Sequence, residues 1–191
     1  MEAEASGAVE RARSGDNEAF RLLVEQHGRA IFRLAYRMTG NEEDAEDVVQ
    51  ETFLKAYRQI DRYEARASFS TWLYRIASNC SLDLIRKRKT RERNRDRGRD
   101  PGQDVLVSIP APTPGPERVL YSSQISVSVQ AALDELSGQE RAAFILRHFE
   151  GLSIEEIGRA LGIGASATKH SIFRAVHKLR HSLEPIVSSA R

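Results

Sequence analysis

Apolar residues recur every three or four positions through most of the chain, which is the spacing of amphipathic helices. No stretch alternates between apolar and polar residues with period two, so the pattern predicts helices and no sheet. The first helix is expected to begin after a cap at Asp16 or Asn17 and to end at Gly40. Its buried stripe comprises Phe20, Leu23, Val24, His27, Ile31, Leu34, Ala35 and Met38.

Two more helices are predicted before residue 89. Asn41 can cap one of them, whose apolar face comprises Ala45, Val48, Val49, Thr52, Phe53 and Ala56. The other begins near Phe69, after the polar loop 61–68, and runs into a basic segment. Its apolar positions are Phe69, Trp72, Leu73, Ile76, Ala77, Cys80 and Leu84. Three such helices are expected to form a small bundle.

Residues 89–116 have the composition of a linker. Residues 86–100 contain nine Lys or Arg and three acids, and residues 101–116 contain five of the six prolines. Helices and central strands do not tolerate proline at this density. We therefore expect an all-α chain of two small helical domains, 1–88 and 117–191, joined by a Pro-rich flexible linker. At full extension the linker could span roughly 90 Å.

The segment after the linker has the pattern of a helix-turn-helix. A helix expected near 118–136 is followed by two S-x-x-E capping boxes, Ser137 with Glu140 and Ser153 with Glu156, each of which begins a short helix. A turn with glycine at both ends, 162–164, then precedes a longer helix, whose inward residues are Ile172, Ala175, Val176 and Leu179. In this layout the second helix enters the major groove of DNA.

Residues 165–191 carry five Lys or Arg and one Glu, a balance suited to contact with phosphates. An ordinary helix with a solvated basic face has a similar composition, but the glycine turn and the two capped helices favour DNA binding. The candidate DNA contacts on the outward face are Ala165, Ser166, Lys169, His170, Arg174 and Lys178.

Residues 69–88 combine aromatic and basic side chains, as proteins that bind unstacked DNA do. The candidates are Phe69, Trp72, Tyr74, Arg75, Asn79, Arg86 and Arg88. Phe69 and Trp72 share a face with Ile76 and Cys80, so packing in the core competes with base stacking for these two rings. Tyr74 and Arg75 point away from that face and are the better candidates for DNA contact.

Residues 42–51 contain six acids and no base. Carboxylates in the first turn stabilise a helix through its dipole, but this explains only the start of the segment. The remaining acids would repel DNA. This surface is therefore expected to meet a basic protein partner.

The sequence disfavours several other classes of protein. No run approaches the roughly 18 apolar residues of a membrane span, and the N-terminus lacks the apolar core of a secretory signal, so we expect a cytoplasmic protein. The single cysteine, Cys80, excludes an internal disulfide. P-loop, G-x-G-x-x-G, H-E-x-x-H and G-x-S-x-G motifs are absent, and His177 and His181 lack a third metal ligand. No enzymatic activity, cofactor or metal is expected.

In their order and spacing, these segments resemble a bacterial RNA polymerase sigma factor of the extracytoplasmic-function (ECF) class. DAEDVVQETFLKAYR at 44–58 is similar to the family segment that docks on the clamp helices of the largest polymerase subunit. FSTWLYRIASNCSLDLIRKRK at 69–89 resembles the segment that melts and reads the −10 promoter element. Residues 133–163 resemble the start of the four-helix domain that binds the −35 element. The resemblance covers nearly the whole chain.

The resemblance implies roles for particular residues and partners. The residues facing the clamp would be Asp44, Asp47, Gln50 and Glu51. The residues at −10 DNA, where the loop 62–68 would hold a flipped-out base, would be Arg62, Arg66, Ser68, Trp72, Arg75, Asn79, Arg86 and Arg88. The implied partners are core RNA polymerase, through its clamp helices and flap, promoter DNA, and an anti-sigma factor, with no small-molecule substrate. The reach of the linker exceeds two turns of DNA at about 35 Å each, so the two domains could occupy both elements.

The chain departs from the family pattern at two positions. Family members often read T-V-K-S-R-L at the recognition helix, where residues 167–172 read ATKHSI. Lys169 and Arg174 fit the pattern, but Ser171 replaces the usual arginine, so the resemblance carries no −35 base preference over to this position. Gly158 stands where alanine is more usual, and it is expected to loosen its helix by roughly 1 kcal/mol without changing the fold.

Two other functions compete with that of a promoter-specificity subunit. A free-standing helix-turn-helix regulator would sense a ligand or dimerise through its first domain and would bind palindromic sites. The acidic segment 42–51 and the proline-rich linker favour the sigma factor. A small helical enzyme that uses the histidines or acids would need motifs that the chain lacks.

Overall fold

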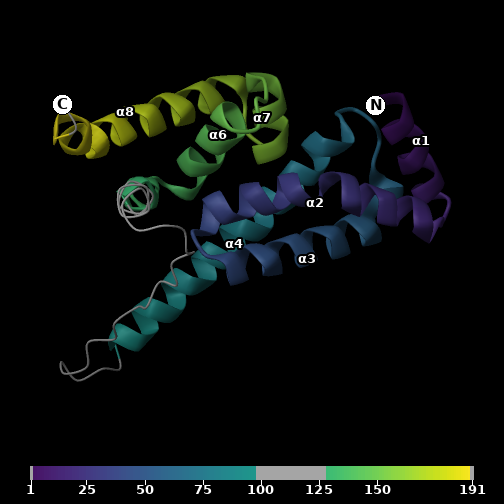
Figure 1. The fold of residues 1–191 in the computed structure, drawn as a ribbon, viewed down its shortest axis with the longest axis horizontal. Helices are drawn as coiled ribbons and strands as arrows, with labels where there is room; N and C mark the ends of the chain where they lie inside the picture. The colour runs from purple at the N-terminus through teal and green to yellow at the C-terminus, as the bar shows by residue number, and fades with distance from the viewer. Residues whose placement is uncertain (1, 98–127, 190–191) are drawn as a thin grey trace, which may run out of the picture.

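The computed structural model describes residues 2–97 and 128–189, and every regular element within these ranges is helical (Figure 1). The prediction of an all-α chain is confirmed. Residues 98–127, which include most of the predicted linker and the start of the helix expected near 118–136, lie outside the described residues. Among the described helices, none is long and apolar enough to cross a membrane.

The ends of α2 (Asn17–Thr39) are set by the residues expected to cap it. The carboxylate of Asp16 accepts hydrogen bonds from the backbone N–H groups of Glu18 and Ala19, both at 3.0 Å. Gly40 closes the helix in the left-handed conformation, with φ of 70°, and its N–H donates to the carbonyl of Tyr36. Left-handed backbone favours glycine because it has no Cβ.

The next three elements are α3 (Glu42–Gln59), the 3₁₀ helix η1 (Ile60–Arg62) and α4 (Phe69–Arg97). Asn41 caps α3 as predicted, since its side chain accepts a hydrogen bond from the N–H of Asp44. α4 continues into the basic residues after 88, so it includes the start of the segment assigned to the linker.

A further helix, α1 (Glu2–Arg13), precedes α2 and was not predicted. Its buried residues are Ala8, Val9 and Ala12, which pack in the core with α2. Alanine and valine give a weak periodic signal, because alanine is also common at exposed positions of helices.

After residue 128 the chain forms a helix over 128–134, followed by α6 (Gly138–His148), α7 (Ile154–Leu161) and α8 (Ala165–Ser189). Both predicted capping boxes are confirmed. In each box the serine hydroxyl accepts from the backbone N–H of the glutamate three residues later, and that glutamate accepts from the serine N–H.

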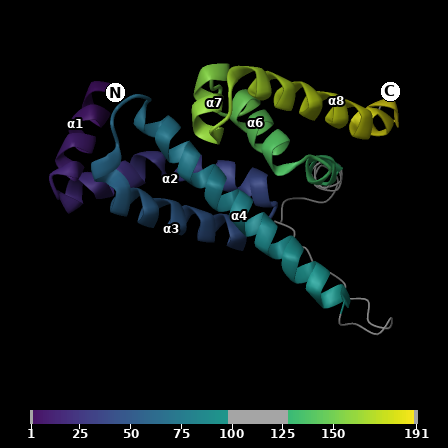
Figure 2. The same ribbon diagram turned by 180° about the vertical axis from the view of Figure 1, so that it is seen from behind.

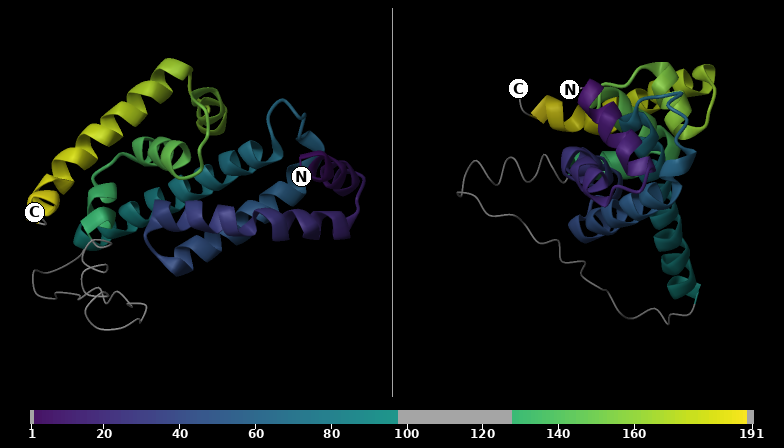
Figure 3. Two further views of the ribbon diagram at one scale, coloured as in Figure 1. Left: turned by 45° about the horizontal axis from the view of Figure 1, so that its top comes forward. Right: turned by 90° about the vertical axis from the view of Figure 1, so that its right-hand side faces the viewer.

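The helices form two packed groups that share one core. α2, α3 and α4 lie side by side, with α1 at one end, and α6 and α7 lie along α2 and α4 (Figures 1 and 2). α8 packs on α6 and α7 and lies on the outside (Figure 3). One buried cluster joins the two groups and includes Leu23, Leu34, Leu73, Ile145, Leu146 and Ile157. A smaller cluster, which includes Leu133 and Leu179, joins residues 128–136 to α8.

Cys80 belongs to this core. It is a free cysteine, buried on α4, with its Sγ atom 3.5 Å from Nζ of Lys55. Burial raises the pKa of the thiol by more than the neighbouring Lys55 lowers it. Cys80 is therefore held as a neutral thiol and behaves as a small packing residue.

Gly158 has a packing role that the sequence did not indicate. A Cβ atom added there would lie 2.8 Å from the backbone oxygen of Ile163 and 3.3 Å from Oγ1 of Thr168. The carbonyl of Gly158 also accepts hydrogen bonds from the N–H groups of Gly162 and Ile163. The expectation that Gly158 only loosens its helix is therefore incomplete, because the missing side chain lets α7 approach the turn that leads to α8.

We expect alanine to have opposite effects at two glycines. Gly28→Ala, within α2 and with no atom within 4 Å of the added Cβ, should raise the free energy of unfolding by about 0.5–1 kcal/mol through helix propensity. Gly158→Ala should lower it by about 1 kcal/mol, because overpacking against a backbone carbonyl outweighs the same propensity gain. Urea unfolding of the three proteins measures both effects, and stabilisation by Gly158→Ala would show that the close approach is not required.

Candidate DNA and polymerase interfaces

The turn between α7 and α8 fixes the direction of the candidate recognition helix. Gly162 adopts the left-handed conformation, with φ of 67°, and ends α7. Thr168, fully buried in the first turn of α8, donates its hydroxyl to the carbonyl of Gly164 at 3.1 Å. Thr168 therefore anchors the start of α8 to the turn and orients the outward residues beside it.

The start of α8 presents polar side chains to solvent. Of the candidates for −35 DNA, Ala165, Ser166, Lys169, His170 and Arg174 are exposed. The inward side of the helix is formed by Thr168, Ser171, Ala175 and Leu179, all buried. The structure thus gathers five of the six candidates on the accessible side of α8.

Phe173 is a further residue of this face that the sequence reasoning missed. Its side chain is 69% exposed, and its ring centroid lies 6.5 Å from that of His177, one turn further along α8. Single exposed apolar residues are common on protein surfaces, so it is the position of Phe173 beside Lys169, His170 and Arg174 that makes it a candidate contact. Its spacing of four residues from Lys169 was the signal that it points outward.

Ser171 and Lys178 face α6 instead. Ser171 is buried, and its hydroxyl accepts a hydrogen bond from Nε2 of Gln139 at 3.3 Å. The ammonium of Lys178 lies 2.7 Å from Oε2 of Glu140, the carboxylate that closes a capping box. Lys178, a candidate for DNA contact, therefore joins α8 to α6 in this structure.

The carboxyl of Glu140 is sensitive to this ion pair. Burial acts to raise its pKa, but hydrogen bonds from Lys178 and Ser137 lower it by more, so the pKa lies below its ordinary value. A carboxyl whose pKa is lowered on folding stabilises the folded state above its unfolded-state pKa of about 4.3. That stabilisation is lost as the pH falls through the lowered value.

We expect Lys178→Met to lower the free energy of unfolding by about 1 kcal/mol at pH 7, because a largely buried carboxylate loses a charged donor. The difference from the unmodified protein should shrink as the pH falls through the lowered pKa of Glu140, because the neutral carboxyl no longer gains from the ammonium. Denaturant unfolding at several pH values measures it. Arg174→Met, on the exposed side of α8, is the control and should leave stability nearly unchanged. Equal effects of the two substitutions would show that the ion pair between Lys178 and Glu140 does not stabilise the fold.

Between residues 69 and 82, only a narrow stripe of α4 is exposed, and it carries Arg75 and Asn79. From residue 86 to residue 91 every side chain of the helix is exposed, and Arg86 also pairs with Asp83 at 3.1 Å. Arg62, the last residue of η1, is exposed as well, and so are Arg66 and Ser68 in the loop before α4. Arg66 pairs with Glu64 at 2.7 Å, and Oγ of Ser68 accepts from the N–H of Thr71 at the start of α4.

The loop before α4 is braced by aromatic rings. Tyr63 packs against Phe69 and Trp72, with ring centroids 5.6 and 5.5 Å apart, and its hydroxyl donates to the carbonyl of Ala67 at 2.7 Å. Phe69 is buried and Trp72 is half-buried, so both contribute to the core. Ala65, at the loop, has φ of 53°, a left-handed conformation that is uncommon for a residue other than glycine.

Tyr74 differs from its prediction. The tyrosine is buried, and its hydroxyl donates to Oε2 of Glu150 at 2.8 Å. The prediction that it is available to contact DNA is therefore wrong for this structure. The helical spacing correctly predicted that Tyr74 and Phe69 lie on different sides of α4. However, the second group of helices covers the side of α4 on which Tyr74 lies.

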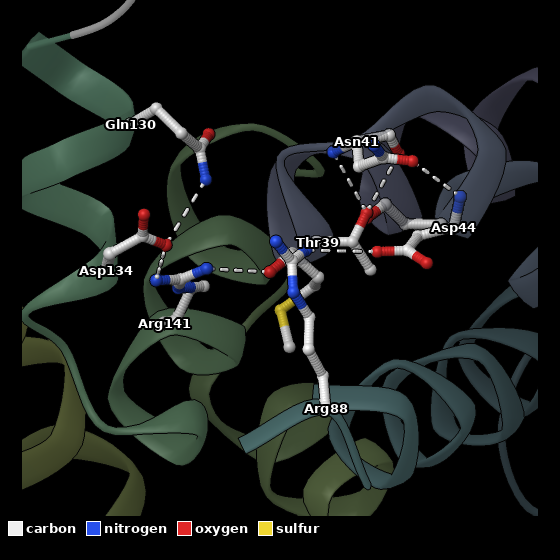
Figure 4. A network of polar contacts seen from close by, with 9 residues as sticks. Thr39, Asn41, Asp44, Arg88, Gln130, Asp134 and Arg141 are labelled. Atoms are coloured by element: carbon white, nitrogen blue, oxygen red, sulfur yellow. Dashed lines mark hydrogen bonds and ion pairs between the residues drawn. The ribbon is translucent and has the colours of Figure 1, made fainter. Parts of the chain in front are cut away.

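The exposed face of the acidic helix α3 combines polar and apolar side chains. Asp47, Gln50 and Glu51 are exposed, and Leu54, one turn after Gln50, is 44% exposed among them. Asp44 is half-buried and lies 3.4 Å from Arg88 of α4 (Figure 4). Asp44 is a candidate for polymerase contact and Arg88 is a candidate for DNA contact. In this structure the two side chains are neighbours.

Known proteins share both groups of helices. The model of Sigma-70 region 2 matches residues 23–91, and that of Sigma-70, region 4, matches residues 126–179. The ECF RNA polymerase sigma factor SigE of Mycolicibacterium smegmatis is 40% identical over 161 residues, which are 84% of this chain and 60% of that protein. This chain therefore spans less than two thirds of that relative. SigW of Bacillus subtilis, an ECF sigma factor, is 34% identical over 93% of this chain and 96% of its own length.

Solved structures give the same result. CnrH in complex with the cytosolic domain of CnrY is similar with a TM-score of 0.69, at 26% identity, over 95% of this chain and 98% of that one. The sigma factor RpoE of Bartonella quintana, in complex with the anti-sigma factor NepR, has a TM-score of 0.64 at 25% identity, over 86% and 96%. The fold and the two matched regions define a sigma-70-type RNA polymerase sigma factor. With 34% identity along nearly all of SigW, the chain belongs to the ECF class.

Proposed function

We propose that this ECF sigma factor binds core RNA polymerase through the exposed residues of α3 and directs it to promoters read by α4 and α8. The observation that carries this proposal is the separation of charge: exposed cations lie on α4 and α8, in the two matched sigma regions, and exposed acids lie on α3. The sigma factor binds and melts DNA, and the polymerase performs the chemistry. We place this work in the cytoplasm, where both partners are.

At the −35 element, the outward face of α8 would enter the major groove. Lys169 and Arg174 are long cationic donors that can bond to guanine edges or phosphates, and Ser166 is a short donor near the helix start. Phe173, exposed on the same helix, is suited to contact the methyl group of thymine. Lys178 stays a candidate at the edge of this face: its side chain is 43% exposed, and its ammonium pairs with Glu140.

At the −10 element, the exposed stripe of α4 and the loop before it would hold the separated strands. Arg75, Asn79 and Arg86 offer cations and an amide along one line, which suits a DNA backbone. Trp72 is half-buried, so one part of its ring remains available to a base. Tyr63 supports the loop in which a flipped-out base would lie, because it contacts both Trp72 and the loop backbone.

On the polymerase side, Leu54 supplies an apolar contact within the acidic face of α3. Protein interfaces commonly combine an apolar centre with a polar rim, and complementary charge sets their orientation. We also propose an anti-sigma factor as a partner, on the likeness to RpoE of B. quintana, whose structure contains the anti-sigma factor NepR. The free-standing regulator is not favoured, because both sigma regions match along the chain.

We expect the double charge reversal Asp47→Lys and Glu51→Lys to weaken binding to core polymerase by about tenfold or more, because like charges then face a basic partner. Both side chains are exposed, so the helix content measured by circular dichroism should not change. Affinity for core, measured by fluorescence anisotropy, is the test. Glu10→Lys with Glu25→Lys reverses two exposed acids of α1 and α2 and is the control matched in charge. Normal core binding by the α3 variant would overturn the docking assignment.

We expect Lys169→Ala with Arg174→Ala to reduce run-off transcription from a cognate promoter by about tenfold or more, with core binding unchanged, because each lost contact weakens promoter recognition. The promoter would be selected by transcribing a pooled genomic library with core polymerase and this protein. Arg11→Ala with Arg29→Ala removes two exposed cations from α1 and α2 and is the matched control. An equal loss of core binding would show that α8 is not the recognition helix.

A further inference from the structure

A row of rings connects α2 to the loop between η1 and α4. This loop, residues 63–68, leaves the body at the end of the molecule where α1 lies (Figures 1 and 2). Phe69, the first residue of α4, is buried directly after it. The ring centroid of Phe69 lies 5.6 Å from that of Tyr63 and 5.4 Å from that of His27. His27 of α2 is thus connected, through one ring, to the tyrosine that binds the loop backbone.

The loop depends on this support, because its backbone is not relaxed. Ala65 has φ of 53°, and among residues 2–97 and 128–189 it is the one residue other than glycine with positive φ. A residue keeps such a conformation only where its surroundings hold it. The hydroxyl of Tyr63 holds the loop by donating to the carbonyl of Ala67 at 2.7 Å. A displacement of Phe69 that shifts Tyr63 therefore also loosens the loop.

His27 is a polar residue in apolar surroundings. Its Nε2 atom is buried and has no hydrogen-bond partner within the described residues. The residues one turn away on α2 include Leu23, Val24 and Ile31, which are apolar. Both ring nitrogens of a protonated histidine are donors, so a proton on His27 would leave a charged N–H group buried without an acceptor. The place beside Phe69 therefore favours the neutral imidazole.

Charged groups do not offset this burial. The helices that pack on α2 are α1, α3, α4 and α6. Among their described residues no acid or base contributes to the pKa of His27, which burial alone lowers. Tyr63, the other titratable group of the cluster, keeps its proton, because burial raises the pKa of its hydroxyl. His27 is therefore the group of this cluster that can change its charge near neutral pH.

We propose that His27 is a positioning residue for the loop 63–68, and that protonation of His27 loosens the loop that would hold the flipped-out −10 base. The inference rests on the role proposed above for this loop. When the ring of His27 leaves Phe69, the change passes through Tyr63 to the carbonyl of Ala67. The base needs the held conformation of the loop, so the sigma factor loses −10 recognition as the pH falls.

Acid favours the loosened loop. The pKa of His27 is lower in the packed state than in the loosened state, where the ring meets water and regains its ordinary pKa of about 6.5. The loosened state therefore binds the proton more tightly, and acid shifts the balance toward it. The support from His27 is complete above about pH 6.5 and is progressively lost below that value.

Intrinsic fluorescence tests the loosening without DNA. Trp72 is the only tryptophan of the chain, and its ring centroid lies 5.5 Å from those of both Tyr63 and Phe69. Between about pH 7.5 and pH 5, the fluorescence of the unmodified protein should change with a midpoint below about 6.5. That of His27→Phe should stay constant, because phenylalanine fills the same place and takes no proton. Circular dichroism gives the pH range in which the helices stay formed.

Two further variants and one direct measurement complete this test. His148→Phe replaces an exposed histidine of α6 and is the matched control, which should respond like the unmodified protein. His27→Leu repeats the comparison with a second side chain that takes no proton. NMR of the histidine Cε1–H groups follows the titration of His27 in the unmodified protein. An ordinary pKa for all five histidines, or the same fluorescence profile with and without His27, would overturn the proposal.

2-Aminopurine in the −10 element of the selected promoter tests the consequence for DNA, since its fluorescence rises when the base leaves the stack. With core polymerase, the signal obtained with the unmodified sigma factor should fall by about threefold or more between about pH 7.5 and pH 5.5. With His27→Phe it should fall by less than about twofold. The effects of pH on the polymerase and on the exposed histidines of α8 are common to both proteins and cancel in the comparison.

The outcomes separate this proposal from the promoter role. An equal fall with the two proteins would show that His27 does not position the loop. No signal from either protein at about pH 7.5 would count against the promoter role instead. The fluorescence of Trp72, measured without DNA or polymerase, would then still decide whether His27 controls the loop.

Discussion

The packing of α4 on two sides governs what the molecule can present to a partner. One side of the helix meets α2 and α3, and another meets α7. Leu73, Ala77 and Ser81 are buried, so an accessible stripe is left that carries Arg75 and Asn79. A helix buried on both flanks cannot rotate to offer other side chains. The side chains that this part of α4 can offer to a partner are therefore set by the packing of its neighbours.

Ion pairs and hydrogen bonds also hold the helices in this arrangement. Glu140 and Lys178 join α6 to α8, and Thr168 ties α8 to the turn before it. Glu140 and Thr168 are buried, so each is costly to leave unpaired, and their contacts fix the direction of α8. The pair between Asp44 and Arg88 differs, since Arg88 is exposed. Exposed pairs contribute little to stability, so either partner can exchange this contact for another.

Features decided within a few residues could be predicted from the sequence. The caps at Asp16 and Asn41, both capping boxes and the left-handed Gly40 depend on one turn of chain, and all were predicted. The exposed side of α8 also followed from helical spacing. The burial of Tyr74 and the close contact at Gly158 could not be foreseen in this way. Both depend on which helix packs against which, and local periodicity carries no information about that choice.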